Sequence, residues 1–139
     1  MWRAVDHEGE VLESYVTKRR DKRAAFNFLS KAMRKHGLPN KIITDKLISY
    51  GAALKIIGAS TLQDTMQYLN NRSENSHLSF QRRERAMLRF RRLTTLQKFT
   101  SIHSQIFNHF NHQRYLQKRN NFEELRNASL SEWRGLCAA

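Results

Sequence analysis

The chain has 139 residues, of which 40% are hydrophobic, so it is long enough for one domain with one modest core. Its 25 Lys and Arg against 12 Asp and Glu leave a formal charge of +13, which favours a polyanionic partner, above all nucleic acid. No segment has the unbroken apolar length of a membrane span, and the single cysteine excludes an internal disulfide framework and a cysteine-based zinc site. The sequence indicates a cytoplasmic protein without a membrane partner.

The N-terminal third predicts a β-hairpin followed by a helix. Residues 2–5 and 11–17 are short runs of β-forming side chains, and Asp6 and Gly9 between them suit a tight reversal. From Asp21, a predicted N-cap, apolar side chains recur every three or four residues until Gly37, with Pro39 just beyond. We therefore expect one amphipathic helix with defined ends.

The middle of the chain predicts strand, turn and helix. Residues 41–45 are a short apolar run that ends in Asp45, and residues 50–57 read as a short helix closed by Gly58. Residues 61–67 are a weaker strand candidate, because polar side chains interrupt the apolar run. This alternation of strands and helices predicts an α/β fold with a mixed sheet.

Helices are expected in the C-terminal half. Asn70 and Asn71 offer a cap for a helix over residues 72–90, and apolar side chains line one face of a long helix from Leu93 to about residue 110. The Ser-x-x-Glu spacing of Ser129 and Glu132 predicts the start of a short terminal helix. Tyr115 and Trp133 are expected as aromatic side chains of the core or its rim.

Two carboxylates are candidates for chemistry. Asp45 ends an apolar run, where open α/β sheets place active groups; the alternative is a simple N-cap of the next helix. Glu74 lies in a polar stretch at a helix start, where an acid also complements the helix dipole. Together, a carboxylate at a strand end and another on a nearby helix are the hard oxygen ligands that a Mg²⁺-dependent phosphoryl-transfer site requires.

Basic and imidazole side chains follow these acids. Six arginines lie within residues 82–92, and Arg82, Arg85 and Arg89 would share one helical face that could hold DNA backbone, with Arg83 adjacent. The alternative is a solvated face balanced by Glu84. Lys46 is a further phosphate contact candidate. His77 follows Glu74 by three residues and is a candidate proton shuttle or phosphate contact, or else ordinary helix-surface polarity.

Five ordered sequence blocks carry a resemblance to a known family. They are Trp2-Arg3-Ala4-Val5-Asp6, the segment 19–25 (RRDKRAA), the segment 43–51 around Asp45, the segment 68–77 (YLNNRSENSH), and the segment 82–90 that begins Arg82-Arg83-Glu84. In this order they resemble the catalytic domain of DDE-type transposases of the insertion-sequence-six family, over residues 2 to about 113. By that resemblance Asp45 matches the second acid of an Asp, Asp, Glu triad and Glu74 matches the third.

The resemblance implies an RNase H-like mixed sheet with flanking helices, and an activity in which Mg²⁺ or Mn²⁺ assists DNA cutting and joining at the ends of a mobile element. The family's first acid lies in an Asp-Glu-Thr-Tyr block on the strand before Trp2, and these residues are not in the chain. We therefore expect a fold without its first, central strand, and no turnover from this chain alone. Asp6 is a candidate to replace this missing acid, but the family pattern places Asp6 in the hairpin turn.

The resemblance also implies a division into a DDE domain at residues 1–113 and a helical tail at residues 114–139. DNA is the implied partner, and self-association is left open. A competing reading is a non-catalytic, basic DNA-binding protein derived from a transposase. A third is a product without function.

Overall fold

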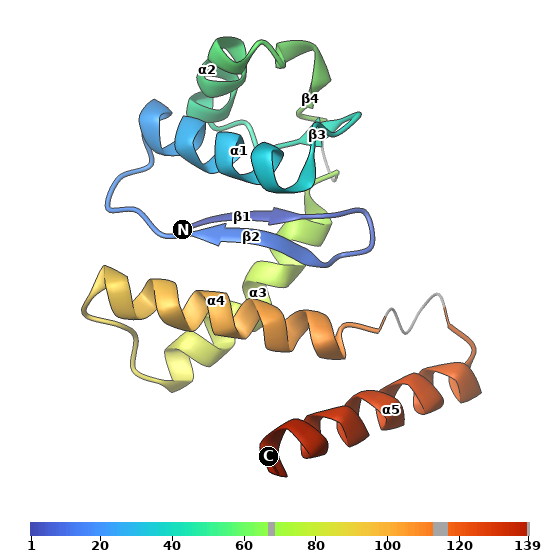
Figure 1. The fold of residues 1–139 in the computed structure, drawn as a ribbon. Helices are drawn as coiled ribbons and strands as arrows, with labels where there is room; N and C mark the ends of the chain where they lie inside the picture. The colour runs from blue at the N-terminus through green and yellow to red at the C-terminus, as the bar shows by residue number, and fades with distance from the viewer. Residues whose placement is uncertain (67–68, 113–116, 139) are drawn as a thin grey trace.

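The computed structural model describes residues 1–66, 69–112 and 117–138. It is a mixed α/β structure in which helices flank two small sheets (Figure 1). The elements in chain order are β1 (Trp2–Val5), β2 (Val11–Tyr15), α1 (Lys22–His36), β3 (Ile42–Ile43), α2 (Ile48–Ile57), a 3₁₀ turn (Ser60–Leu62), β4 (Gln63–Asp64), α3 (Asn71–Ala86), α4 (Leu93–Phe110) and α5 (Arg119–Ala138).

The expected hairpin forms from β1 and β2. The strands pair antiparallel, with Trp2 opposite Tyr15 and an irregularity between Ala4 and Val5. The Asp6 carboxylate closes the turn, because its Oδ1 accepts the backbone N–H groups of both Glu8 and Glu10 at 2.9 Å. Gly9 adopts a φ of 87°, a left-handed conformation that glycine reaches without a Cβ clash.

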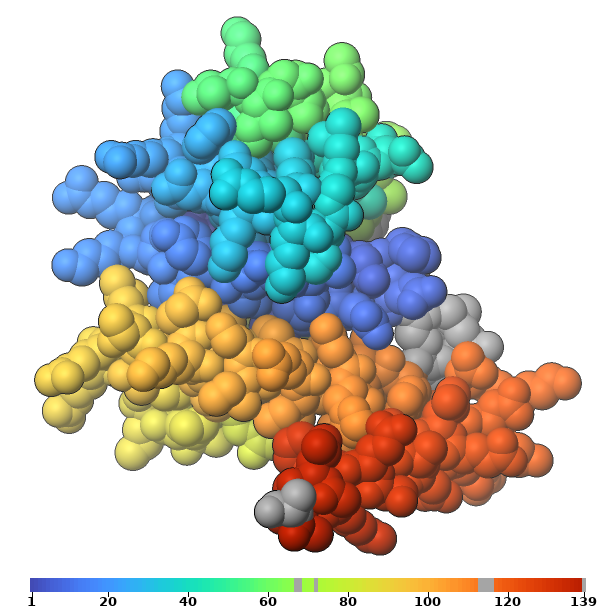
Figure 2. All heavy atoms as spheres, in the orientation of Figure 1, coloured from blue at the N-terminus to red at the C-terminus, as the bar shows by residue number. Residues whose placement is uncertain are grey.

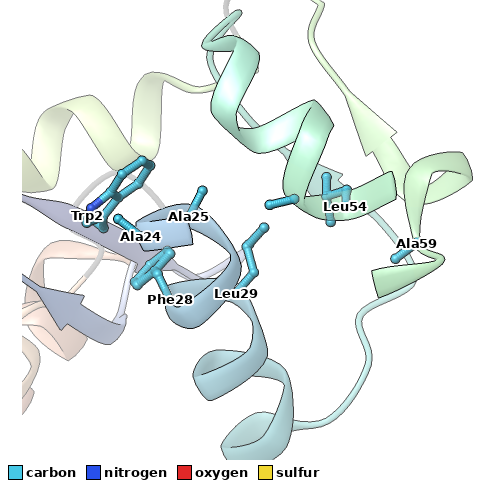
Figure 3. Packing of buried hydrophobic residues seen from close by; sticks show 8 residues of the cluster. Trp2, Ala24, Ala25, Phe28, Leu29, Leu54 and Ala59 are labelled. Carbon is cyan, nitrogen blue, oxygen red and sulfur yellow. The ribbon is translucent and has the colours of Figure 1, made fainter. Parts of the chain in front are cut away.

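Helix α1 also forms between the ends that the sequence predicts. The Asp21 side chain accepts the Ala24 N–H at 2.8 Å, and Gly37 closes the last turn by donating its N–H to the Met33 carbonyl. The helix buries Ala24, Ala25, Phe28 and Leu29 against Trp2 of β1 and Leu54 of α2, which forms the main apolar core (Figure 3). Trp2 stacks on Phe28 and meets the Tyr50 ring edge-on.

Strands β3 and β4 are shorter than the sequence suggests. They pair in parallel through Ile42 with Gln63 and Ile43 with Asp64, and Asp45 lies two residues beyond β3. A 3₁₀ turn replaces the start of the second expected strand, and Gln67 lies outside the described residues. Only two residues of each strand face a partner, so the regular pairing ends there.

The two sheets are separate in the described part of the chain: β1 pairs with β2, and β3 pairs with β4 (Figure 1). The hairpin lies between helices. Trp2 faces α1 and α2, while the next residue, Arg3, has its guanidinium 5.9 Å from the ring centres of Phe80 on α3 and Phe107 on α4. Figure 2 shows the blue hairpin as a band between the cyan atoms of α1 and the orange atoms of α4.

Helix α4 seals the outer edge of β2. The Asn108 side chain donates to the Val11 carbonyl and accepts from the Val11 N–H. The Gln97 side chain donates to the Ser14 carbonyl and accepts from the Val16 N–H. These side-chain amides take the place of a neighbouring strand, because they satisfy backbone groups that would otherwise lack partners. On the same face, Ser14 and Ser104 join their hydroxyls at 3.2 Å.

The end of α3 differs from the prediction. The helix stops at Ala86 rather than near residue 90, because Leu88 and Arg89 adopt φ values of 58° and 64°. The N–H of Arg89 binds the Glu84 carbonyl and the N–H of Leu88 binds the Arg85 carbonyl, which is the Schellman arrangement of a helix end. The expectation that Arg89 shares a helical face with Arg82 and Arg85 is therefore wrong.

The terminal helix is longer than predicted, and Ser129 does not begin it. Helix α5 starts at Arg119, so Ser129 and Glu132 lie inside it and form no capping box. Ser129 is buried instead: its carbonyl lies 2.9 Å from Nε2 of His109 on α4, and its hydroxyl lies 2.8 Å from Nε2 of His112, two residues beyond α4. Trp133 packs on His109 and Phe110 as a rim aromatic, whereas Tyr115 lies outside the described residues.

Candidate functional site

A cleft of about 1270 Å³ opens between the two sheets, and we call it the intersheet cleft. Residues 1–7 and residues 39–45 line it along the two strand edges, while β2 contributes only Leu12. Side chains of α1 line it on one side, and the N-terminal half of α3 lines it on the other. The cleft is therefore bounded by both sheets and by helices from both faces of the hairpin.

Asp45 and Glu74, the two acids singled out from the sequence, both line this cleft. The segment after β3 carries Asp45, whose Oδ1 accepts the Leu47 N–H at 3.2 Å in the turn before α2. Burial raises the pKa of the Tyr50 phenol to about 12, and the nearby negative charge of Asp45 adds to this rise. Asp45 is exposed, and its second carboxylate oxygen, Oδ2, takes no part in the hydrogen bond from Leu47.

Glu74 lies in the first turn of α3 and is exposed. The Asn70 side-chain amide donates to its Oε1 at 3.5 Å, which is a weak interaction at that length. An acid in a first helical turn also gains from the helix dipole, so the local setting alone would explain its presence. Its position on the same cleft as Asp45 is a second observation that the helix dipole does not explain.

His77 lies one turn beyond Glu74 and lines the same cleft. Burial, reinforced by the nearby charges of Arg3, the N-terminus and Arg20, lowers the pKa of His77 to about 4. Its imidazole is therefore neutral near pH 7. A neutral ring can donate one hydrogen bond and accept another, but it does not offer a positive charge to phosphate.

The five basic residues that the sequence singled out as DNA contacts lie outside the cleft lining. Arg82, Arg83 and Arg85 are exposed on the second half of α3, Arg89 is exposed beyond the helix end, and Lys46 is exposed beside Asp45. No ion pair with an acid is present at any of these five residues in the described part of the chain. Arg83 borders a separate apolar cavity of about 370 Å³ with Phe99 and Phe107.

Asp6 also lines the intersheet cleft, but its carboxylate is used in the hairpin turn, where Oδ1 accepts two backbone N–H groups. This agrees with the turn role that the sequence pattern assigns to it. Across residues 1–66, 69–112 and 117–138, no group of three His, Cys, Asp or Glu side chains is gathered as a metal site. Besides Asp6, two acids line the cleft, Asp45 and Glu74, and both are exposed.

Arg3 is a cleft residue that the sequence did not single out. It is only 5% exposed, and its three guanidinium nitrogens have no hydrogen-bond partner within the described residues. Burial lowers the pKa of Arg3 to about 10, so it stays charged at neutral pH. Side chains alternate along a strand, so the sequence of β1 predicts that Arg3 and Trp2 point to opposite faces. It does not predict that helices cover both faces of the strand.

Comparison with known proteins assigns the chain to a family. A family model described as a DDE domain matches residues 1–113. Two relatives from Staphylococcus aureus are each 37% identical over 82 residues: the transposase for insertion sequence-like element IS431mec, and the transposase for insertion sequence element IS257 in transposon Tn4003. That alignment covers 55% of this chain and only 37% of each relative. No solved structure matches the chain.

Among the described residues, no helix is long and apolar enough to cross a membrane.

The family match covers both strands of the hairpin, the segment that carries Asp45 and the helix that carries Glu74. The chain belongs to the DDE-domain family of insertion-sequence transposases, of the insertion-sequence-six type.

Proposed function

We propose that this chain is part of the catalytic domain of a DNA transposase, with an RNase H-like arrangement, in which Asp45 and Glu74 hold a divalent metal ion for phosphoryl transfer at the ends of a mobile element. The observation that carries the proposal is that both acids, from segments 29 residues apart in the sequence, line one cleft. DNA is the proposed substrate, in the cytoplasm.

The side chains present have the right chemistry to bind a divalent cation, but they supply fewer carboxylates than a two-metal site needs. Carboxylate oxygens are the ligands that Mg²⁺ and Mn²⁺ prefer, and both Asp45 and Glu74 are exposed on the cleft. Two carboxylates leave a two-metal site incomplete, since a third normally bridges the ions. A bound cation would stabilise the attacking and leaving oxygens of an in-line displacement.

The surrounding side chains have separate roles in this proposal. The Leu47 N–H orients the Asp45 carboxylate, and Glu74 lies in the first turn of α3, where a negative charge complements the helix dipole. Arg82, Arg83 and Arg85 would contact the DNA backbone further along α3, with Lys46 contacting phosphate beside Asp45. Arg89 remains a phosphate contact candidate, now from the loop after α3.

In this proposal His77 acts through an uncharged imidazole. Because its pKa is about 4, it would accept or donate a hydrogen bond to a water or a DNA oxygen at the cleft, rather than pair with phosphate as a cation. We further propose that residues 1–113 act as the DDE domain and residues 114–139 as a helical tail. Self-association of the chain, which the sequence leaves open, is part of the same proposal.

Metal binding is the direct test. We expect Mn²⁺ to bind the chain with a measurable heat of binding, and we expect Asp45→Asn and Glu74→Gln each to weaken binding at least about tenfold, because each removes a charged ligand. Glu124→Gln on α5 is the matched control, since it removes the same charge from an exposed acid away from the cleft. Isothermal titration calorimetry measures all four proteins. Equal affinity in Glu124→Gln and Glu74→Gln would refute the assignment.

Catalysis is tested separately. We expect no strand transfer when the 139-residue chain alone is mixed with Mg²⁺ or Mn²⁺ and with DNA that carries the element ends. The reason is that two acids are too few ligands for a site with two metal ions. A gel assay of joined products measures this. Robust joining that Asp6→Asn abolishes would show that Asp6 supplies the third ligand, and the proposal of inactivity would then be wrong.

A further inference from the structure

Helix α4 packs on the hairpin through its polar side. Thr100 and Ser104 are its buried residues, and its side-chain amides bind the backbone of β2 from the same side. Its apolar stripe is turned away from the hairpin, so that Ile102 is 57% exposed and Ile106 is 37% exposed. An amphipathic helix usually buries its apolar side. The stripe of α4 is therefore a surface that the described part of the chain leaves partly uncovered.

This stripe lines the cavity of about 370 Å³ to which α3 contributes Arg83, and we call it the α3–α4 cavity. Its other lining residues come from α4 and the residue after it: Phe99, Ile102, His103, Ile106, Phe107, Phe110 and Asn111. Three rings follow one another along the wall, with centres 5.7 Å apart from Phe99 to His103 and 6.4 Å apart from His103 to Phe107. The volume is in the range of small-molecule sites, and the wall is largely aromatic.

His103 gives the α3–α4 cavity a polar group. Its Nδ1 is buried and has no hydrogen-bond partner within the described residues. Burial lowers the pKa of His103, with Arg3 and Arg83 as further causes, so the ring is neutral at pH 7 and can donate one hydrogen bond and accept another. An occupant with polar edges can pair with this ring, whereas an aliphatic side chain would leave it without a partner, which is costly inside a protein.

Arg83 gives the same cavity a positive charge. It is exposed, and Arg82 and Arg85 lie beside it on α3. Among the described residues that line the cavity, none is acidic. A second copy of this chain would bring a further charge of +13 to this place, whereas a polyanion would neutralise the arginines. Charge complementarity therefore favours a negatively charged occupant.

We propose that the α3–α4 cavity holds one unpaired nucleobase of a DNA strand, with Arg83 on the phosphate beside that base and Arg82 and Arg85 on neighbouring phosphates. A nucleobase has flat faces that stack on aromatic rings, polar edges that can bond to His103 and Asn111, and a linked phosphate for the arginines. Inside a duplex both its faces are stacked and its edge is paired, so only an unpaired base can enter. The inference rests on the proposed binding of DNA and extends it from backbone contacts to a base.

Methyl resonances of the cavity isoleucines test the proposal directly. The chain is labelled with ¹³C at its isoleucine methyl groups and titrated with a duplex that carries one unpaired adenine. We expect the Ile102 and Ile106 methyl signals to shift, because the ring current of a base in the cavity acts on both. Ile56 on α2 is the control, since it is 55% exposed and does not line the cavity. The fully paired duplex of the same sequence should cause much smaller shifts.

Affinity provides a second readout. We expect the duplex with the unpaired adenine to bind about tenfold more tightly than the paired duplex, because stacking on protein rings adds to the backbone contacts. Ile106→Trp fills the cavity and should abolish this preference while leaving the affinity for the paired duplex unchanged, since it removes no charge. Leu125→Trp on α5 is the matched control, because Leu125 is 40% exposed and lies outside the cavity lining, and it should keep the preference.

Unshifted Ile102 and Ile106 signals with the unpaired-base duplex would overturn the inference whatever the affinity. If both duplexes then bind equally well, the proposed DNA contacts of α3 still stand; if neither binds, those contacts are rejected as well. Shifts of the same signals that depend on protein concentration without DNA would assign the cavity to a second copy, which also overturns the inference. If Ile106→Trp does not fold, the methyl shifts of the unmodified chain decide the result.

Discussion

His77 combines a cleft position with a strongly lowered pKa, and this gives it a measurable effect on stability. Its folded pKa is about 4, against 6.5 for the free side chain, because burial and neighbouring positive charges disfavour the imidazolium. The unfolded chain therefore binds a proton more readily than the folded chain between these two values. The contribution of His77 to stability is complete above pH 6.5 and is lost as the pH falls toward 4.

We therefore predict that the free energy of unfolding falls between pH 6.5 and pH 4, and that His77→Gln removes a large part of this fall. Urea titrations at several pH values measure it. His7→Gln is the control, because His7 lies on the exposed hairpin turn. His103 adds to the remaining slope, since burial also lowers its pKa, with Arg3 and Arg83 as further causes. Identical pH profiles for the chain and His77→Gln would show that the imidazole carries no such penalty.

At the scale of single elements, the end of α3 stores backbone strain. Leu88 occupies the left-handed position of the Schellman arrangement, where glycine is normal, and its side chain is 92% exposed and so contributes little packing. A Cβ in this conformation costs on the order of 1–2 kcal/mol. This cost is offset only in part by the lower backbone entropy of leucine in the unfolded state.

Leu88→Gly is therefore expected to raise the free energy of unfolding by about 1 kcal/mol. The matched control is Met87→Gly one residue earlier, where φ is −92° and the added backbone freedom should destabilise the protein. Chemical denaturation distinguishes the two signs. A loss of stability in Leu88→Gly would mean that its exposed side chain makes contacts that matter more than its backbone conformation.

Elements with strong local signals were predictable, and those defined by tertiary contacts were not. The hairpin, α1 and α4 follow from alternation, from the Asp21 cap and from a continuous apolar stripe. The start of helix α5 was missed because the Ser-x-x-Glu spacing at Ser129 imitates a helix start, whereas Ser129 lies inside the helix and contacts His109 of α4 and His112 just beyond α4. The early end of α3 was missed because leucine at position 88 gives no signal for a left-handed residue.

The candidate site was predictable only in part. The resemblance to the transposase family named Asp45 and Glu74, and their common cleft is a property of the fold rather than of either local motif. Local rules alone assign Asp45 to a turn and Glu74 to a helix dipole, and both local interactions are present. Arg3 could not be found in this way, because its burial depends on helices α3 and α4 that come much later in the chain.

At the scale of the whole molecule, the charge of +13 is the property most relevant to DNA. In the proposed DNA complex, Arg82, Arg83 and Arg85 would release counterions on contact with phosphates, so affinity would fall steeply with salt. We predict that Arg82→Ala combined with Arg85→Ala lowers the slope of log affinity against log salt by about one unit for each arginine removed. The loss should be uniform across DNA sequences, because backbone contacts carry no sequence information.

Fluorescence anisotropy with duplex DNA at several salt concentrations measures these slopes. The control is Arg23→Ala combined with Arg34→Ala on α1, which removes the same charge from exposed positions elsewhere. If both double variants lower the slope equally, binding depends on net charge and not on α3. If neither does, the arginines of α3 are a solvated surface, as the balancing presence of Glu84 would allow.

The sealing of β2 by α4 also limits how this protein can aggregate. Amyloid growth needs a strand that offers pairing on both sides, so that each added molecule presents a fresh template to the next. Asn108 and Gln97 occupy one side of the hairpin, which leaves β1 as its single growing end. When a second copy pairs through its own β1, both hairpins have used their open edge, so two hairpins can pair with each other but cannot propagate into a fibril.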